Sequence, residues 1–143
     1  MALTDRSSHA PARSGWTRTP LLVAGDALAF LVFSATGRAS HGEAAGFAAA
    51  LQVAETAAPF IVGWLLVAPL AGAYRPDVVV SPRAMAARTA LAWLIACPVG
   101  LALRALLRQT GIPLSFAITT FLFNLAILLA WRLVYASLAR RRA

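Results

Sequence analysis

Residues 21–37, LLVAGDALAFLVFSATG, form an apolar stretch that carries a single acidic residue, Asp26. Its length approaches the roughly 20 residues that an α-helix needs to cross a hydrocarbon core of about 30 Å. An ionised carboxylate inside such a helix costs about 3 kcal/mol or more unless it is paired or hydrated. The stretch therefore predicts a transmembrane helix and, with it, a partner for Asp26.

The composition of the whole chain favours a membrane protein. Of its 143 residues 60% are hydrophobic and only 13% are charged, whereas an ordinary soluble domain is about 45–50% apolar and about 25% charged. A soluble core of this size cannot bury so much apolar surface, so the lipid bilayer is the expected solvent. The net charge of +8 comes entirely from arginines that mostly flank apolar runs, and this pattern predicts no nucleic-acid partner.

Three further apolar runs follow the first, at about residues 56–74, 86–107 and 114–137. Each is long enough to span a bilayer as a helix. Pro59 predicts a bend, so residues 41–55 are expected to form a short interfacial helix between the first two spans. The fold class is therefore all-α, a polytopic bundle of four transmembrane helices.

The ends of the chain are polar. Residues 1–19 predict a disordered cytoplasmic tail, residues 20–138 the transmembrane domain, and residues 139–143 a basic cytoplasmic tail. Arginine counting sets the orientation, because cytoplasmic loops carry an excess of basic residues. Ten arginines fall on the side of both termini and three on the other side, which predicts a multi-pass protein of the plasma membrane with cytoplasmic N and C termini.

Two groups of polar residues at membrane depth are the candidate sites. Asp26 lies near the cytoplasmic end of the first span, at the same depth as Arg88 and Arg132, so an Asp26 pair with Arg132 or Arg88 is expected. Asn124, near the middle of the fourth span, completes the intramembrane site and is expected to hydrogen-bond across helices.

The second candidate site lies on the outer side. Arg88 and Arg104 are separated by about 22 Å of helix, which is less than the core thickness, so at least one of them must snorkel or find a partner. We expect Glu55 to be the partner of Arg104. Arg38 and His41 belong to the same outer layer.

No motif predicts catalysis, a metal or a cofactor. The sequence lacks GxSxG, HExxH and P-loop patterns, and its one cysteine, Cys97, lies in an apolar run. His9 and His41 both fall outside the spans, which excludes an intramembrane bis-histidine haem. The sequence therefore favours a protein that is not an enzyme.

Several of these positions resemble the pattern of a known family. The segments GDALAFLVFSATGRASH, TAAPFIVGW and SFAITTFLFNLAILLAWR, with an LR pair in the third span, are similar to a family of small bacterial and archaeal integral membrane proteins catalogued as a domain of unknown function. The resemblance covers about residues 20–135 and implies four spans but no activity. It points to Gly25, Asp26, Gly37, Arg38, His41, Pro59, Phe60, Gly63, Trp64, Arg104, Ser115, Phe116 and Arg132.

Three classes of function remain open. The first is a structural or accessory membrane subunit, as a homo-oligomer or with a partner membrane protein, whose arginine–carboxylate pairs are satisfied within the chain. The second is a small transporter or ligand-binding carrier that uses Asp26 facing a cavity. The third is a membrane enzyme acting at headgroup level, which requires Asp26, His41 or Glu55 to converge on one site.

Overall fold

The computed structural model describes residues 18–40 and 46–141, and this part of the chain contains helices and turns but no strand. The elements are α1 (Arg18–Ser40), α2 (Phe47–Leu70), α3 (Pro76–Val79), α4 (Pro82–Arg108) and α5 (Leu114–Arg141). All but α3 are long and apolar enough to cross a membrane. The expected all-α bundle with four membrane-spanning helices is confirmed, and it fits a multi-pass integral membrane protein.

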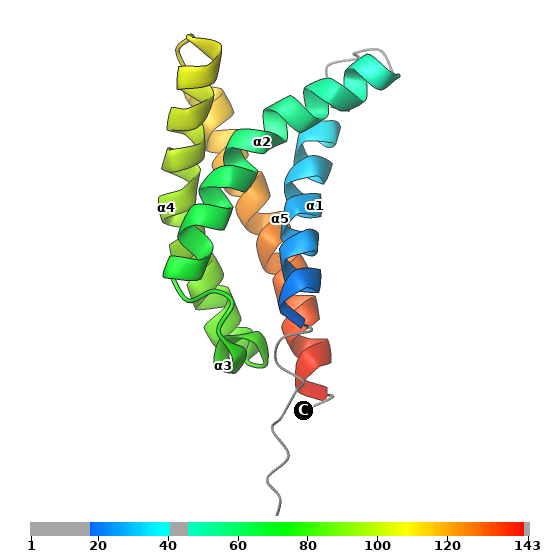
Figure 1. Cartoon of the computed structure of the whole chain (residues 1–143), viewed down its shortest axis with the longest axis vertical. Helices are drawn as coiled ribbons and strands as arrows, with labels where there is room; N and C mark the ends of the chain where they lie inside the picture. Colours follow the sequence, from blue (N-terminus) through cyan, green and yellow to red (C-terminus); the bar gives the residue numbers. More distant parts are fainter. Residues whose placement is uncertain (1–17, 41–45, 142–143) are drawn as a thin grey trace, which may run out of the picture.

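The four long helices form a ring in which each packs against two neighbours. Packed pairs are α1 with α2, α2 with α4, α4 with α5, and α5 with α1 (Figure 1). The short α3 packs on α4 and α5 at one end of the bundle, which we call the α3 end. Between 17% and 33% of the residues in each apolar window are buried, so most of the bundle's outer surface is left for lipid.

The second helix differs from the prediction. Residues 47–55, expected to belong to a separate interfacial helix, are the first part of the continuous helix α2. Figure 1 shows that α2 crosses the bundle obliquely and changes direction near its middle. Pro59 lies there, and a proline inside a helix removes one backbone hydrogen bond and bends the axis. The bend predicted at Pro59 is therefore present, but it does not divide α2 into two separate helices.

The connection between α2 and α4 is the part that the sequence predicted least well. The second span was expected to run to residue 74, but α2 ends at Leu70 and Gly72 has a φ of 71°, a conformation that favours glycine. The turn frees the Ala73 carbonyl and brings Tyr74 back toward the bundle. By contrast, the Ser81–Pro82 start of α4 has the expected cap, with the Ser81 hydroxyl accepting from the Ala84 amide at 3.4 Å.

The predicted tails fall mostly outside the described residues. Helix α1 begins at Arg18, and the preceding residues 1–17 lie outside this part of the chain. Helix α5 continues to Arg141, so most of the predicted basic tail at 139–143 is helical.

Candidate functional site

The interior of the bundle is layered because α1 and α5 place matching residues on their inward faces. Residues four apart share one face of a helix. On α1 this face presents Asp26, Phe30 and Ser34, all of them buried. On α5, which runs antiparallel to α1, the inward positions are Thr120, Asn124, Leu128 and Arg132, also buried. Stacking these faces gives an ion-pair layer near the α3 end, an aromatic layer above it and an uncharged polar layer beyond.

The ion-pair layer is built on Asp26 and Arg132. The Arg132 guanidinium donates from Nε to Asp26 Oδ1 at 2.8 Å and from Nη2 to Asp26 Oδ2 at 2.7 Å. Both side chains are fully buried. This two-point geometry is the strongest arrangement available to an arginine and a carboxylate. The expected pairing of Asp26 with an in-span arginine is therefore present, and Arg132 is that arginine.

The remaining hydrogen-bonding capacity of this pair is also used. Oδ2 of Asp26 accepts from the Tyr74 hydroxyl at 2.6 Å and from the Trp64 indole nitrogen at 3.1 Å. The third nitrogen of Arg132, Nη1, lies 3.1 Å from the Ala73 carbonyl oxygen and 3.5 Å from the Thr89 hydroxyl. A buried ion pair is tolerated only when its other lone pairs and protons are satisfied in this way. The layer thus joins α1 and α5 through a buried ion pair, which we call the ion-pair lock.

Aromatic rings enclose the same pair. The guanidinium of Arg132 stands 5.0 Å from the Trp64 ring centre and 4.8 Å from the Tyr74 ring centre. Such cation–π contacts strengthen when water is excluded. Sequence reasoning missed Tyr74 as a partner, because only the turn after α2 brings it back. The signal for Trp64 was available, since a buried indole N–H needs an acceptor.

Arg88 does not join this cluster. It was expected beside Asp26, but its guanidinium donates to the Ala71 carbonyl at 3.1 Å and the residue is exposed. Thr89, the next residue, faces inward and is buried, and residue 88 is rotated about 100° from it around the helix axis, which carries Arg88 out of the bundle. It caps the end of α2 instead.

Tyr74 lies in the connection between α2 and α3, outside the membrane-spanning helices, and its hydroxyl reaches back to Asp26. Burial raises its pKa, and the Asp26 charge and hydrogen bond raise it further. A group whose pKa is raised on folding contributes stability below its unfolded pKa, and that contribution is lost as pH rises through the folded value. Free tyrosine ionises at about pH 10. We therefore expect the neutral phenol of Tyr74 to continue to donate to Asp26 above that pH.

This effect can be measured because the chain has only two tyrosines. In Tyr135→Phe, which leaves Tyr74 as the single tyrosine, we expect no tyrosinate absorbance at about pH 10, the ordinary tyrosine pKa. Absorbance should rise only together with alkaline unfolding, followed by circular dichroism. Ionisation near the ordinary pKa in the folded protein would show that Tyr74 is not held as described.

An aromatic layer separates the ion pair from the other end of the bundle. In a cluster of Phe30, Phe60, Trp64 and Trp93, the Trp93 ring lies against the other three, with ring centres 5.4 Å apart for Phe30 and Trp93 and 6.3 Å apart for Trp64 and Trp93. These four side chains are each no more than 1% exposed. Asp26 is therefore closed off from that end by packed rings.

Beyond the rings lies the uncharged polar layer of Ser34, Thr120 and Asn124. The Asn124 amide nitrogen donates within its own helix to the Thr120 carbonyl at 2.9 Å, rather than across helices as expected. The Asn124 carbonyl oxygen and the hydroxyls of Ser34 and Thr120 are buried without a hydrogen-bond partner among the described residues. Such groups are rare in native proteins and call for an explanation, such as water or a ligand.

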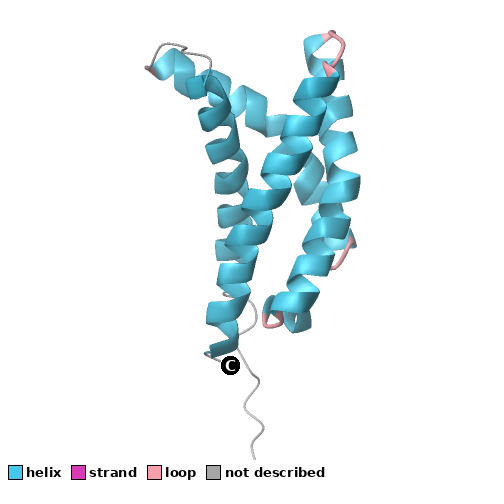
Figure 2. Cartoon of the chain, turned by 180° about the vertical axis from the view of Figure 1, so that it is seen from behind, coloured by secondary structure: helices cyan, strands magenta, loops and turns pink. Residues whose placement is uncertain are grey.

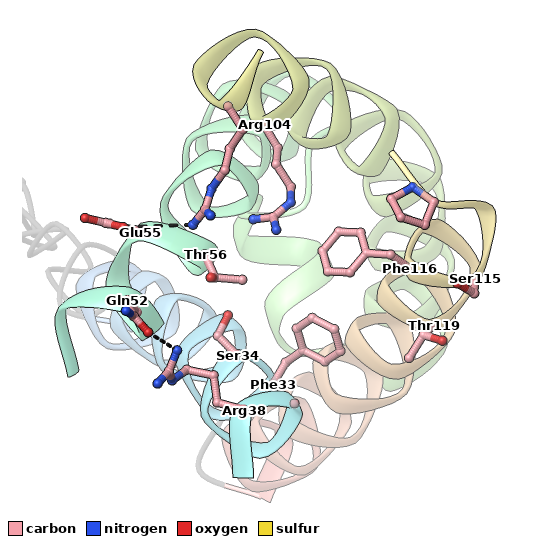
Figure 3. A pocket seen from close by; sticks show the side chains of 13 residues that line it. Phe33, Ser34, Arg38, Gln52, Glu55, Thr56, Arg104, Ser115, Phe116 and Thr119 are labelled. Atoms are coloured by element: carbon pink, nitrogen blue, oxygen red, sulfur yellow. Dashed lines mark hydrogen bonds and ion pairs between the residues drawn. The ribbon is translucent and has the colours of Figure 1, made fainter. Parts of the chain in front are cut away.

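A cavity of about 690 Å³ opens at the end opposite α3, which we call the pocket end (Figure 3). Its floor is Ser34. Helices α1, α2, α4 and α5 all contribute to its wall, and the charged residues in its lining are Arg38, Glu55, Arg104 and Arg108. The outer group of residues predicted from the sequence therefore surrounds one cavity, except for His41, which lies outside the described residues.

The ion pairs at the pocket end differ from the prediction. Glu55 lies 3.9 Å from Arg108 rather than beside Arg104, a distance at which two half-exposed groups interact weakly. Arg38 donates to the side chain of Gln52. The Arg104 guanidinium stacks 4.6 Å from the Phe116 ring centre, and its Nη1 atom is buried without a hydrogen-bond partner in the described residues.

The described part of the chain has no group of three or more histidine, cysteine or acidic residues that could hold a metal ion. Its one cysteine, Cys97, is buried and unpaired. The inner site holds helices together through its ion pair, and the outer one presents positive charge to a cavity.

A four-helix membrane bundle with a buried ion-pair lock and an arginine-lined cavity is the class that this fold and these sites define. The chain belongs to the family described as Protein of unknown function (DUF3054), which it matches over residues 23–135. The resemblance inferred from the sequence motifs is thereby confirmed. Searches of curated proteins and of solved structures gave no significant match.

Proposed function

We propose that this protein is a membrane-embedded binding protein for an organic anion, with the cavity at the pocket end as its site. The observation that carries the proposal is the lining, which holds three arginines and one glutamate. A volume of about 690 Å³ lies within the range of about 300–1,000 Å³ in which small ligands are bound. The proposal belongs to the ligand-binding carrier class, but it places the site at Arg104 instead of Asp26.

Arg104 is the residue expected to contact the anion. Stacking on Phe116 fixes one face of its guanidinium, and Figure 3 shows both side chains at the same cavity. An arginine can donate to an oxyanion through two parallel N–H groups, and its buried Nη1 lacks a partner among the described residues. A bound anion would accept a hydrogen bond from this nitrogen.

Asp26 is not part of this site. The cavity floor at Ser34 is eight residues from Asp26 along α1, about 12 Å of helix, with the aromatic layer between. The carrier hypothesis that required Asp26 to face a cavity therefore loses its main support. The enzyme hypothesis is also weakened, since Asp26 and Glu55 lie in different layers rather than converging.

A structural or accessory role is the second candidate. It is supported by the Asp26–Arg132 pair, whose hydrogen bonds are all made within the chain. Under this hypothesis the buried polar contacts of the bundle serve its stability, and the protein acts as a homo-oligomer or with a partner membrane protein. Native mass spectrometry of the protein in lipid nanodiscs tests it by reporting stoichiometry.

We propose that the protein lies in the plasma membrane and that its α3 end faces the cytoplasm. Among the described residues the arginines at the α3 end outnumber those at the pocket end, which are Arg38, Arg104 and Arg108. The excess of positive charge on the cytoplasmic side of membrane proteins supports this orientation. The cavity then opens toward the outer side.

The binding proposal is tested by thermal unfolding in a neutral detergent, followed through tryptophan fluorescence, with short carboxylates and phosphate monoesters added. A ligand at about 100 times its Kd stabilises a protein by about 2.7 kcal/mol. We expect such an anion to raise the unfolding midpoint of the wild type, and Arg104→Gln to weaken its binding by about tenfold or more.

The matched control is Arg83→Gln, an exposed arginine at the α3 end. It should respond to the anion as the wild type does. If no anion shifts the midpoint, or if Arg104→Gln responds like Arg83→Gln, the binding proposal is wrong.

A further inference from the structure

We infer that the anion bound at the pocket end is the head of an amphiphile, a single oxyanion on an alkyl chain, whose chain leaves the cavity between α1 and α5. This inference rests on the proposed function and adds the chemical class of the ligand. It follows from three features: the positive charge of the cavity lining, the aromatic walls, and the apolar surface onto which the cavity opens.

The charge of the lining favours a negative group, because it holds three arginines and one glutamate. Glu55 lies beside Arg108, and Arg38 donates to Gln52. The described residues offer Arg104 no carboxylate within ion-pair distance, and its Nη1 is buried without a hydrogen-bond partner among them. A single carboxylate or phosphate head would therefore complete the charge pairing at Arg104.

The floor of the cavity supplies a second polar contact. Ser34 is 3% exposed, and its hydroxyl lines the cavity without a hydrogen-bond partner in the described residues. Figure 3 shows Ser34 and Arg104 on different sides of the same space, from α1 and α4. A head group between them accepts from both, which removes the cost of leaving these donors unpaired.

The walls next to these groups are apolar. Phe33 of α1 and Phe116 of α5 line the cavity together with Pro113. A small hydrated anion gains nothing from such surfaces and must be dehydrated to touch them. The first methylenes of an alkyl chain, by contrast, bury apolar area there at about 25 cal/mol per Å².

The cavity continues onto the surface that lipid covers. Ser115 and Thr119 of α5 line the cavity and are exposed, and α1 and α5 diverge toward this end (Figure 2). One turn farther along α5, Leu122 and Phe123 are 55% and 59% exposed. A chain that leaves the cavity past Thr119 therefore reaches an apolar face without crossing water.

The test compares a long-chain and a short-chain form of one head group. The protein in phosphatidylcholine nanodiscs is titrated with lauryl phosphate or methyl phosphate, and ligands retained per chain are counted by native mass spectrometry. We expect one lauryl phosphate per chain, bound at least about tenfold tighter than methyl phosphate, because several methylenes at about 0.8 kcal/mol each become buried.

Two variants and one control locate the site. Arg104→Gln should weaken lauryl phosphate and methyl phosphate alike. Thr119→Phe, a change at an exposed position, should weaken only lauryl phosphate by obstructing the exit of the chain. Arg83→Gln should bind both as the wild type does, and circular dichroism checks that each variant keeps its helices.

Each outcome decides something. Equal binding of the two ligands through Arg104 overturns the amphiphile inference and leaves the proposed anion site standing. Lauryl phosphate binding that Arg104→Gln does not reduce is partition into the bilayer, and it overturns the inference. Failure of both ligands to bind contradicts the inference and the proposed function together.

Discussion

Asp26→Asn is expected to lower the free energy of unfolding by about 3–5 kcal/mol, the usual cost of removing one partner from a buried ion pair. Arg132 would stay buried with its charge uncompensated, held only by neutral acceptors such as the Ala73 carbonyl and the Thr89 hydroxyl. Asparagine keeps the size of the side chain, so the loss is electrostatic. Equilibrium unfolding in mixed micelles of a neutral detergent and dodecyl sulfate measures it.

The double variant Asp26→Asn/Arg132→Gln separates the ion pair from general damage. Because the second change removes the unpaired charge, the two effects should fall short of additivity by about 1–3 kcal/mol. Arg75→Gln is the matched control, since it breaks an ion pair with Asp77 in which both side chains are more than 60% exposed. If the Asp26→Asn protein were as stable as this control, the Asp26–Arg132 pair would not stabilise the bundle as described.

Gly63→Ala is expected to destabilise the bundle by about 1–3 kcal/mol, the usual effect of adding volume to a packed interior. A Cβ at this position would lie 3.0 Å from the Ala96 carbonyl oxygen and 3.1 Å from the Gly100 nitrogen, both of them backbone atoms of α4. No side chain can rotate to relieve these contacts, so α2 and α4 must separate. The same unfolding experiment measures the loss.

The control for this change is Gly37→Ala, where a Cβ would meet no atom within 4 Å. There the substitution should stabilise α1 by about 0.5–1 kcal/mol, because alanine is the better helix former. Opposite signs at the two glycines are therefore expected. Equal effects at both positions would mean that α2 and α4 do not pack as closely as described.

The ion-pair layer shows how far the candidate site could be predicted. That Asp26 needs a cation, and that Arg132 lies at the matching depth, follows from helix rise and the cost of charge in lipid. The choice of Arg132 over Arg88 does not follow, because both lie at about the same depth and only helix rotation about its axis decides which one faces inward. Tyr74 was unpredictable for a different reason: the turn at Gly72 ends α2 earlier than hydropathy suggests.

The cavity at the pocket end shows the same limit. Arg38, Arg104 and Glu55 were placed in one outer layer from their positions in the sequence, but the pairing of Glu55 with Arg108 instead of Arg104 depends on side-chain directions on two neighbouring helices. Ser34 gave no signal, because a serine in an apolar span is ordinary. It becomes a candidate ligand contact only when the fold places its unpaired hydroxyl on the cavity floor.

By itself the sequence determined the membrane environment, the number of spans and the need to neutralise Asp26, since these depend on the length, hydropathy and charge of local segments. The tertiary structure decided the partner of Asp26, the bend of α2 and the existence of a cavity closed off from the ion pair by aromatic rings. These depend on how four helices rotate and cross, and that is set by packing among side chains far apart in the chain.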